Sequence, residues 1–234
     1  NFEEVSFGPI LYGAKKLGMH IHTRYEVSNN AGQDICDIVN NEGFDFLLVG
    51  SGISMSDSPD DIAATRYRTS FYNRYFKRFK APESWFYPGA LLKDKTKMFI
   101  ARSNCDVGVF INRNFVKATN TLVVISSEED LFLLDYTRTL LKATHGSVGI
   151  VAKMSTTTPG HDQILKELWD FVSSTPQTQL LPDKDLTPGL FNSYNFMLIG
   201  YNTWNDVSEH RKEALQKMPS TLILNKNKRS SSDN

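Results

Sequence analysis

The chain is 234 residues long and 40% hydrophobic, which is enough apolar material for one large or two small globular cores. Its 26 lysines and arginines are balanced by 26 aspartates and glutamates, so the composition argues against a protein that attracts nucleic acid non-specifically. The sequence has no run near the roughly 18 apolar residues of a membrane-spanning helix and no apolar secretory signal at its start, so we expect this stretch to lie in the cytosol.

The first part of the chain predicts alternating helices and strands. Residues 6–17 have the apolar spacing of a helix, with Gly18 as its stop. Residues 20–27 alternate between apolar and polar side chains, which predicts a strand with one polar face. A second helix over 33–42 then leads to a strand over 44–50.

Histidines and cysteines in this sequence do not predict a metal site. His20 and His22 would share one face of the predicted strand, but the spacing places no third ligand near them, so we interpret them as solvent-facing. The two cysteines, Cys36 and Cys105, lack the spacing of a metal or disulfide-exchange motif. They favour two free thiols in a reducing compartment.

Residues 51–97 form an insertion far longer than the usual connection between a strand and its helix. Its second part interleaves Arg and Lys with aromatic residues at steps of four, namely Tyr67, Phe71, Tyr75 and Phe79. On a helix these form an aromatic stripe flanked by cations, which we expect to pack against the sheet. In the alternatives, the stripe stacks nucleic-acid bases, lies on an anionic membrane surface or is a docking surface for another protein layer.

After a helix over 91–102 and a strand over 105–111, a polar link at 116–120 marks the candidate domain boundary. The second part is more regular, with strands expected at 121–125, 147–153, 178–181, 195–200 and 220–224. Helices are expected from about 126 to 144, at 161–173 and at 207–218, and Ser126 with Glu129 forms a capping box at the start of the first. This alternation predicts parallel strands joined by right-handed crossovers.

One pattern occurs twice: residues 44–50 read FDFLLVG and residues 194–200 read YNFMLIG. A short apolar run closed by Gly is typical of a strand buried on both faces. Ligands collect beyond the carboxyl ends of such strands, where Gly allows close approach of the backbone, although a plain turn also accounts for the two glycines. The repetition predicts two copies of one α/β unit.

Residues 105–115 read CDVGVFINRNF, which resembles the C-S-V-G-V-F-V-D-R-G-F strand in the cytosolic tails of monovalent cation:proton antiporters. Residues 45–50 and 123–130 are similar to two further strand motifs of those tails. Such tails carry two universal-stress-protein-like α/β units after a transmembrane exchanger domain. The resemblance therefore implies two units with mostly parallel sheets covered by helices: 1–117, incomplete at its N-terminus and carrying the insertion, and 118–225, followed by a disordered tail over 226–234.

The resemblance gives limited support for a bound nucleotide. ATP-binding members of that superfamily show G-x-x-G, nine residues and G-S/T after the fourth strand. Gly50, Ser51 and Gly52 keep only a fragment of this pattern, and Gly200 is followed by no later glycine cluster. We therefore treat Gly50, Ser51 and Gly52 as a weak nucleotide candidate and expect no cofactor.

The first unit also lacks the first two strands of the superfamily's strand order, 3-2-1-4-5. Unpaired strand edges of that kind need a cover. A second copy of the chain, giving a homodimer, is the expected cover, and the aromatic insertion is the alternative.

The resulting hypothesis is a non-catalytic regulatory domain of an integral-membrane Na⁺ or K⁺:proton antiporter. It would lie on the cytoplasmic face of the membrane, and its partners would be its own transmembrane domain and a second copy, with no nucleic acid. No catalytic motif such as G-x-S-x-G, a Walker loop or H-E-x-x-H stands out. The alternatives are a free-standing nucleotide- or small-ligand-binding universal stress protein, or a tail domain of another transporter such as a cation–chloride cotransporter.

Overall fold

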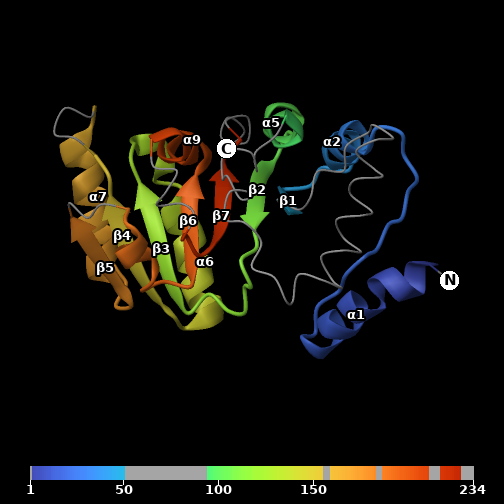
Figure 1. Cartoon of the computed structure of the whole chain (residues 1–234), viewed down its shortest axis with the longest axis horizontal. Helices are drawn as coiled ribbons and strands as arrows, with labels where there is room; N and C mark the ends of the chain where they lie inside the picture. Colours follow the sequence, from blue (N-terminus) through green and yellow to red (C-terminus); the bar gives the residue numbers. More distant parts are fainter. Residues whose placement is uncertain (1, 51–93, 155–158, 183–185, 211–216, 228–234) are drawn as a thin grey trace.

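A single sheet runs through the computed structural model, which describes residues 2–50, 94–154, 159–182, 186–210 and 217–227. Its strands in the described residues have the order β1-β2-β7-β6-β3-β4-β5 (Figure 1). Their bounds are β1 Phe46–Gly50, β2 Asp106–Ile111, β3 Asn120–Ile125, β4 Ser147–Ala152, β5 Thr178–Pro182, β6 Phe196–Gly200 and β7 Ser220–Asn225. The helices are α1 Phe2–Lys16, α2 Ala31–Asn41, α5 Asp94–Arg102, α6 Leu133–Thr144, α7 His161–Ser174, α8 Pro188–Phe191 and α9 Tyr201–His210, with a 3₁₀ turn, η2, at Glu128–Asp130.

The strands of the second half, β5-β4-β3-β6-β7, are all parallel. Val123 of β3 lies opposite Leu198 of β6, so the expected five-stranded parallel arrangement of residues 121–224 is confirmed. Neighbouring residues of each strand serve different cores, since Val123 packs toward α6 and α7 whereas Val124 packs toward α8 and α9. Helices therefore cover both faces of this part of the sheet.

Helix α7 illustrates why the second half folds as its sequence indicates. Ile164, Leu168 and Phe171 recur at helical spacing, and all three are buried against the same face of the sheet. Helix α6 ends at His145, which adopts a left-handed conformation with a φ of 51° and donates its backbone N–H to the carbonyl of Leu141. The chain then turns at Gly146, where a Cβ would lie 2.4 Å from the carbonyl oxygen of Thr119.

The first half contributes the parallel pair β1 and β2, and α2 and α5 cover one face of this pair. Cys36, Phe99 and Val107 form the centre of that smaller core, and both cysteines of the chain are free and buried. Strand β2 pairs with β7 in the antiparallel direction, with Val109 opposite Ile223. The pairs β1–β2 and β6–β7 therefore point in opposite directions across this junction; their relation as tandem copies, and the boundary near residue 117, stay predictions.

Strand β1 corrects one expectation from the repeated pattern. The pattern predicted a central strand buried on both faces, but β1 is at the end of the described sheet and Leu48 is 58% exposed. Phe46 and Leu48 project to the side of α6, where Phe46 meets the ring of Tyr136 at 6.0 Å between centroids. The copy over β6 is central and buried throughout.

Residues 20–27 correct a second expectation, because they form no strand. Their side chains are exposed on both alternating sets, including those of His20, His22 and Val27. A strand needs a neighbour to receive its backbone hydrogen bonds, and alternation in the sequence does not supply one.

Some predictions fall outside the described residues. These include residues 51–93 of the insertion, with its aromatic stripe, and the tail from 228 onward. The predicted helices over 6–17, 33–42 and 91–102 are confirmed in their described parts, with shifted ends. Among the described residues, no helix combines the length and the hydropathy needed to cross a membrane.

Candidate functional site at the carboxyl ends of the parallel strands

The strand order places a switch point between β3 and β6. From β3 the chain proceeds outward to β4 and β5, whereas β6 and β7 lie on the other side of β3. The two neighbouring strands end at Ile125 and Gly200, and the segments that follow them separate. Open α/β sheets bind their ligands in the crevice at such a point, so this end of the sheet is the first place to examine.

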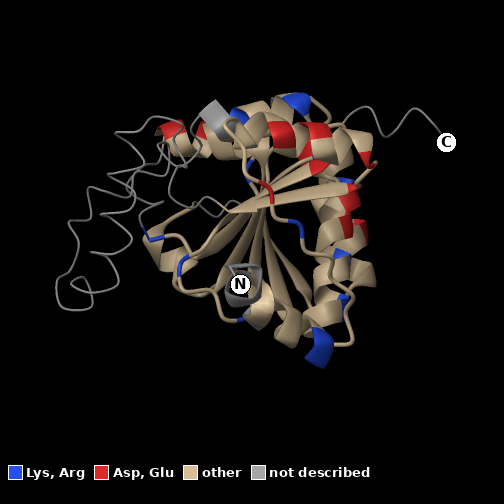
Figure 2. Cartoon of the chain, turned by 90° about the vertical axis from the view of Figure 1, so that its right-hand side faces the viewer, with Lys and Arg blue, Asp and Glu red and all other residues tan. Residues whose placement is uncertain are grey.

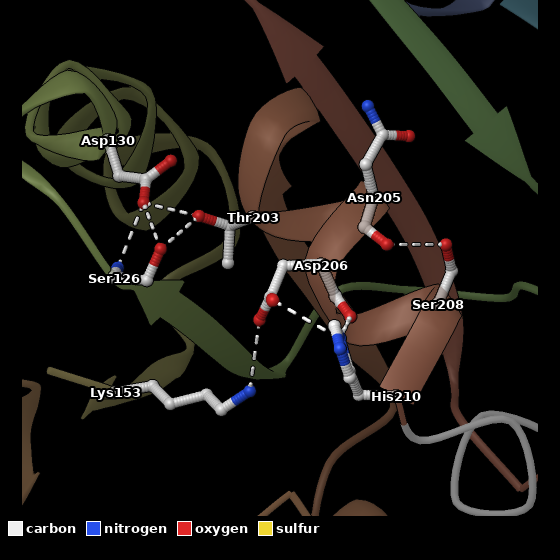
Figure 3. Close-up of polar contacts among 8 residues, drawn as sticks. All are labelled: Ser126, Asp130, Lys153, Thr203, Asn205, Asp206, Ser208 and His210. Carbon is white, nitrogen blue, oxygen red and sulfur yellow. Dashed lines mark hydrogen bonds and ion pairs between the residues drawn. The ribbon is translucent and has the colours of Figure 1, made fainter.

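The position next to both strand ends is taken by the carboxylate of Asp130, which is only 2% exposed. Its Oδ2 accepts hydrogen bonds from the backbone N–H of Ser126 at 2.8 Å, the hydroxyl of Ser126 at 3.2 Å and the hydroxyl of Thr203 at 2.6 Å. The backbone N–H of Ser127 donates to the same oxygen at 3.2 Å. Figure 3 shows the Ser126 and Thr203 contacts, which connect the end of β3 to helix α9.

The same carboxylate leaves no room for a side chain at position 200. A Cβ at this position would lie 2.0 Å from Oδ1 of Asp130, which is far below any contact that real side chains make. The Gly that ends the second copy of the repeat therefore serves close approach, one of the two interpretations that the sequence left open. What approaches its backbone is a side chain of the protein itself.

A hollow of about 370 Å³ lies beside Asp130. Glu128, Glu129 and Asn202 line one part of it, and the amide of Asn202 donates to Oε2 of Glu129 at 2.7 Å. The residues after β7, including Lys226 and Asn227, line another part. With three carboxylates, including that of Asp130, against one ammonium group, the lining disfavours phosphate and suits a neutral or cationic molecule.

A second polar group on α9 lies near this network (Figure 3). Asp206 forms an ion pair with Lys153 at 3.4 Å, and Nδ1 of His210 lies 3.3 Å from the Asp206 carboxylate and 2.8 Å from the Asp206 carbonyl oxygen. Because Asp206 and His210 are largely exposed, these pairs contribute little stability. The pair of Asp206 with Lys153 attaches α9 to the residue that follows β4, whereas the contact with His210 lies within α9.

The hydroxyl groups of this region are bonded to a carboxylate, to a second hydroxyl and to a backbone carbonyl. Ser126 lies against Asp130 and Thr203, and Ser208 donates to the carbonyl oxygen of Asn205 at 2.9 Å. A nucleophilic serine requires a neighbouring base that accepts its proton, such as a histidine. Within the described part of the chain, neither serine has a histidine among its hydrogen-bond partners.

The predicted nucleotide candidate lies elsewhere. Gly50 ends β1 opposite Phe110, whereas Ser51 and Gly52 are outside the described residues. Strands β2 and β7 lie between Gly50 and Gly200, and because β1 runs antiparallel to β6, the two glycines end strands that point in opposite directions. The fold does not bring the two repeated glycines together.

Sequence reasoning also misplaced the capping residue after β3. It paired Ser126 with Glu129, but the capping box is formed by Ser127 and Asp130, each one residue further along, at the 3₁₀ turn that precedes α6. Thr203 and Asn227 were not singled out at all. A signal was present for Asp130 and Thr203, since each follows one of the two strands that flank the switch point within five residues.

The described residues do not arrange metal-ligating side chains into a metal site, either in this hollow or at His20 and His22. No cluster of three or more His, Cys, Asp or Glu side chains suited to a metal ion occurs in the described ranges. Burial raises the pKa of both thiols, Cys36 and Cys105, above the ordinary cysteine value, which keeps them protonated and unreactive.

Known structures share this arrangement of strands and helices. A universal stress protein from Archaeoglobus fulgidus DSM 4304 is similar with a TM-score of 0.54 and 10% sequence identity, over 97% of this chain and 77% of that chain. A functionally unknown protein from Pseudomonas aeruginosa PAO1 gives a TM-score of 0.48 at 11% identity, over 96% of this chain and 78% of that one. No family model and no curated protein matches the sequence.

The likeness at 10% identity shows the fold alone. The chain has a universal-stress-protein-like fold. The expected α/β class and mostly parallel sheet are thereby confirmed.

Proposed function

We propose that the chain is a non-catalytic regulatory module of an integral-membrane Na⁺ or K⁺:proton antiporter, acting on the cytoplasmic face of the membrane. The observation that carries the non-catalytic part is the filled switch point. Four donors that could hold an anionic ligand, two backbone N–H groups and two hydroxyls, already bind the carboxylate of Asp130. A fold that uses its ligand-binding donors internally is suited to recognition or assembly.

The transporter part of the proposal is supported by the resemblance of residues 105–115 to antiporter tails. In the structure this stretch contains β2, the strand that joins the two halves of the sheet. The motif thus coincides with the junction on which the whole arrangement depends. A module of this kind acts by holding its own transmembrane domain in a fixed position relative to that of a second copy.

A second candidate function is a free-standing protein that binds a small ligand. The hollow of about 370 Å³ beside Asp130 favours it, because its size falls within the range of ligand pockets and it lies at the expected end of the strands. Its acidic lining indicates that such a ligand would be neutral or cationic.

Extraction of the natural protein from its own cells separates these functions. If the proposal is correct, an antibody raised against the folded chain detects the protein in membranes after an alkaline carbonate wash. Cation-driven proton exchange in vesicles from those cells should then change when a core residue of the module is altered, for example by Ile199→Asp. The matched surface variant Glu209→Gln should leave exchange unchanged.

Two results would contradict the proposal. Recovery of the antigen in the soluble fraction would overturn the transporter assignment and favour the free-standing protein. A membrane-bound protein whose exchange rate, cation dependence and pH dependence are all unaffected by Ile199→Asp would show that the module does not regulate transport.

A further inference from the structure

Charge is distributed unequally between the two ends of the sheet, although the whole chain has a formal net charge of zero. Figure 2 shows Asp and Glu gathered mainly in the upper part of the molecule, toward which β3, β6 and β7 run in Figure 1. The lowest parts of the fold carry mainly Lys and Arg. A positive end of this kind raises the local concentration of anions.

A hollow of about 410 Å³ lies at this basic end. It is bounded by the segment that follows β2, containing Arg113 and Lys117, and by the residues that precede β6 and begin β7, including Tyr194 and Ser220. Of the described residues that line it, two are cationic and none is acidic. Its charge is therefore opposite to that of the hollow beside Asp130.

Local contacts fix the segment after β2 over this hollow. The backbone N–H of Arg113 donates to Oγ of Ser220 at 2.9 Å, which ties the segment to the first residue of β7. Asn114 adopts a left-handed conformation with a φ of 59°, and the N–H of Phe115 donates to Oδ1 of Asn112 at 2.9 Å. This turn directs residues 113–117 along the rim of the hollow.

The cations have different environments. Burial lowers the pKa of Arg113 below the ordinary arginine value, since the charged guanidinium is partly removed from water. An anion in the hollow offsets that cost, and the planar guanidinium matches the oxygens of a phosphate in a two-point contact. Lys117 is exposed at the rim and adds a second positive charge. Ser220 accepts from Arg113 and can donate its own hydroxyl proton to a ligand.

We propose that this hollow binds the phosphate group of a phosphomonoester through Arg113 and Lys117. Its volume exceeds that of a bare phosphate, and Tyr194 and Val116 offer apolar surface to the organic part of the molecule. The phosphate belongs either to a soluble phosphorylated metabolite or to a lipid headgroup. The site is at the opposite end of the sheet from Asp130 and does not depend on the proposed function.

Calorimetry on the whole folded chain tests the site, with glycerol 3-phosphate as ligand and sodium chloride of equal ionic strength as the blank. Lys117→Gln should weaken binding about three- to ten-fold, because one nearby unit charge is lost. Arg113→Gln should weaken it about ten-fold or more. Lys142→Gln removes an exposed lysine from the last turn of α6, outside the hollow, and should bind as the unaltered chain does.

Thermal unfolding without ligand identifies any variant whose fold is disturbed; Lys117→Gln, exposed in the native state, keeps the test valid if Arg113→Gln is unstable. The proposal is overturned if no binding is detected below about 10 mM, or if Lys117→Gln and Lys142→Gln bind with the affinity of the unaltered chain.

Vesicle flotation separates the two sources. Vesicles of phosphatidylcholine with phosphatidic acid present a phosphomonoester, whereas those with phosphatidylserine carry a similar surface charge without one. Preference for phosphatidic acid that glycerol 3-phosphate competes away indicates a lipid headgroup. Binding of glycerol 3-phosphate without such preference indicates a soluble metabolite, and both results support the site.

Discussion

The hydroxyl of Tyr136 donates a hydrogen bond of 2.9 Å to Oδ2 of Asp106. This contact joins helix α6 of the second half to the first residue of β2 in the first half. The other oxygen of the same carboxylate accepts from the backbone N–H of Asn227 at 2.8 Å, just after β7. Asp106 is thus a common acceptor for two elements of the second half, next to the strand pair that joins the halves.

Replacing Tyr136 by Phe should lower the free energy of unfolding by about 1–3 kcal/mol, because Oδ2 of Asp106 loses a partly buried donor. The ring contacts of Tyr136 with Phe46 and Phe132 are kept by Phe. Urea denaturation measures the change. Tyr12→Phe, on the exposed side of α1, is the control and should have no comparable effect. Equal stability of the two variants would contradict a structural role for the hydrogen bond.

Stability at alkaline pH should depend on the same tyrosine. Burial and the hydrogen bond to Asp106 raise the pKa of Tyr136 above the ordinary tyrosine value. The unfolded chain therefore releases this proton at a lower pH than the native chain does, and stability falls as pH rises above about 10. Urea midpoints measured from pH 8 upward should decline more steeply for the unaltered chain than for Tyr136→Phe. Parallel declines would show that the native pKa is not raised.

Gly200→Ala should be strongly destabilising, by about 2–4 kcal/mol, because its Cβ would overlap Oδ1 of Asp130. Gly189→Ala is the matched control, since a Cβ there meets only the hydroxyl of Thr187 at 3.8 Å. Thermal unfolding compares the two. If Gly200→Ala costs no more than the control, the contact between Asp130 and the end of β6 does not constrain the fold.

Nucleotides should bind weakly or not at all at the switch point beside Asp130. We expect calorimetry with ATP, AMP and cyclic dinucleotides to give no dissociation constant in the low micromolar range. Asp130→Asn removes the negative charge at the switch point and should strengthen any residual nucleotide binding about three- to ten-fold. The control Asp170→Asn, exposed on α7, should not. Low-micromolar binding that Lys117→Gln does not weaken would be independent of the basic hollow and would show that Asp130 does not exclude phosphate.

Self-association should occur through β1. This strand ends the described sheet, and Phe46 and Leu48 are exposed on one face of it. A second copy adding antiparallel to β1 pairs the backbone groups that meet no other strand in the described sheet, and buries both side chains. Light scattering should find a dimer, which Leu48→Asp converts to a monomer. Val116→Asp, at a side chain 91% exposed and outside β1, should remain dimeric. A monomer at high protein concentration would oppose this assembly.

The repeated pattern shows how far local sequence predicts the fold. FDFLLVG and YNFMLIG both predicted a strand, and both contain one. Their burial differs because β6 has β3 and β7 as neighbours, whereas β1 has only β2 in the described sheet. Local apolar character indicates the element, but the number of neighbouring strands depends on distant segments. The same limit explains residues 20–27, whose alternation pairs with no strand among the described residues.

The candidate site was less predictable than the fold. The acidic run after β3 correctly indicated a helix start, but the length of the turn before α6 decides which carboxylate reaches Ser126. A shift of one residue changes the acceptor from Glu129 to Asp130. Thr203 reaches the same carboxylate from α9, 73 residues along the chain, and no local pattern links the two.

The pairing of β2 with β7 also covers an edge of the sheet that could otherwise cause aggregation. Strand β7 is apolar at Leu222, Ile223 and Leu224, and both of its long sides are hydrogen-bonded to other strands. If the first half separated from it, β7 would become a bare apolar edge ready to accept a foreign strand. By pairing with this edge, residues 106–111 block the addition of a strand from another molecule, which would lead to fibrous or domain-swapped assembly. A chain shortened to residues 118–225 is therefore expected to aggregate through this exposed strand even where its own core remains intact.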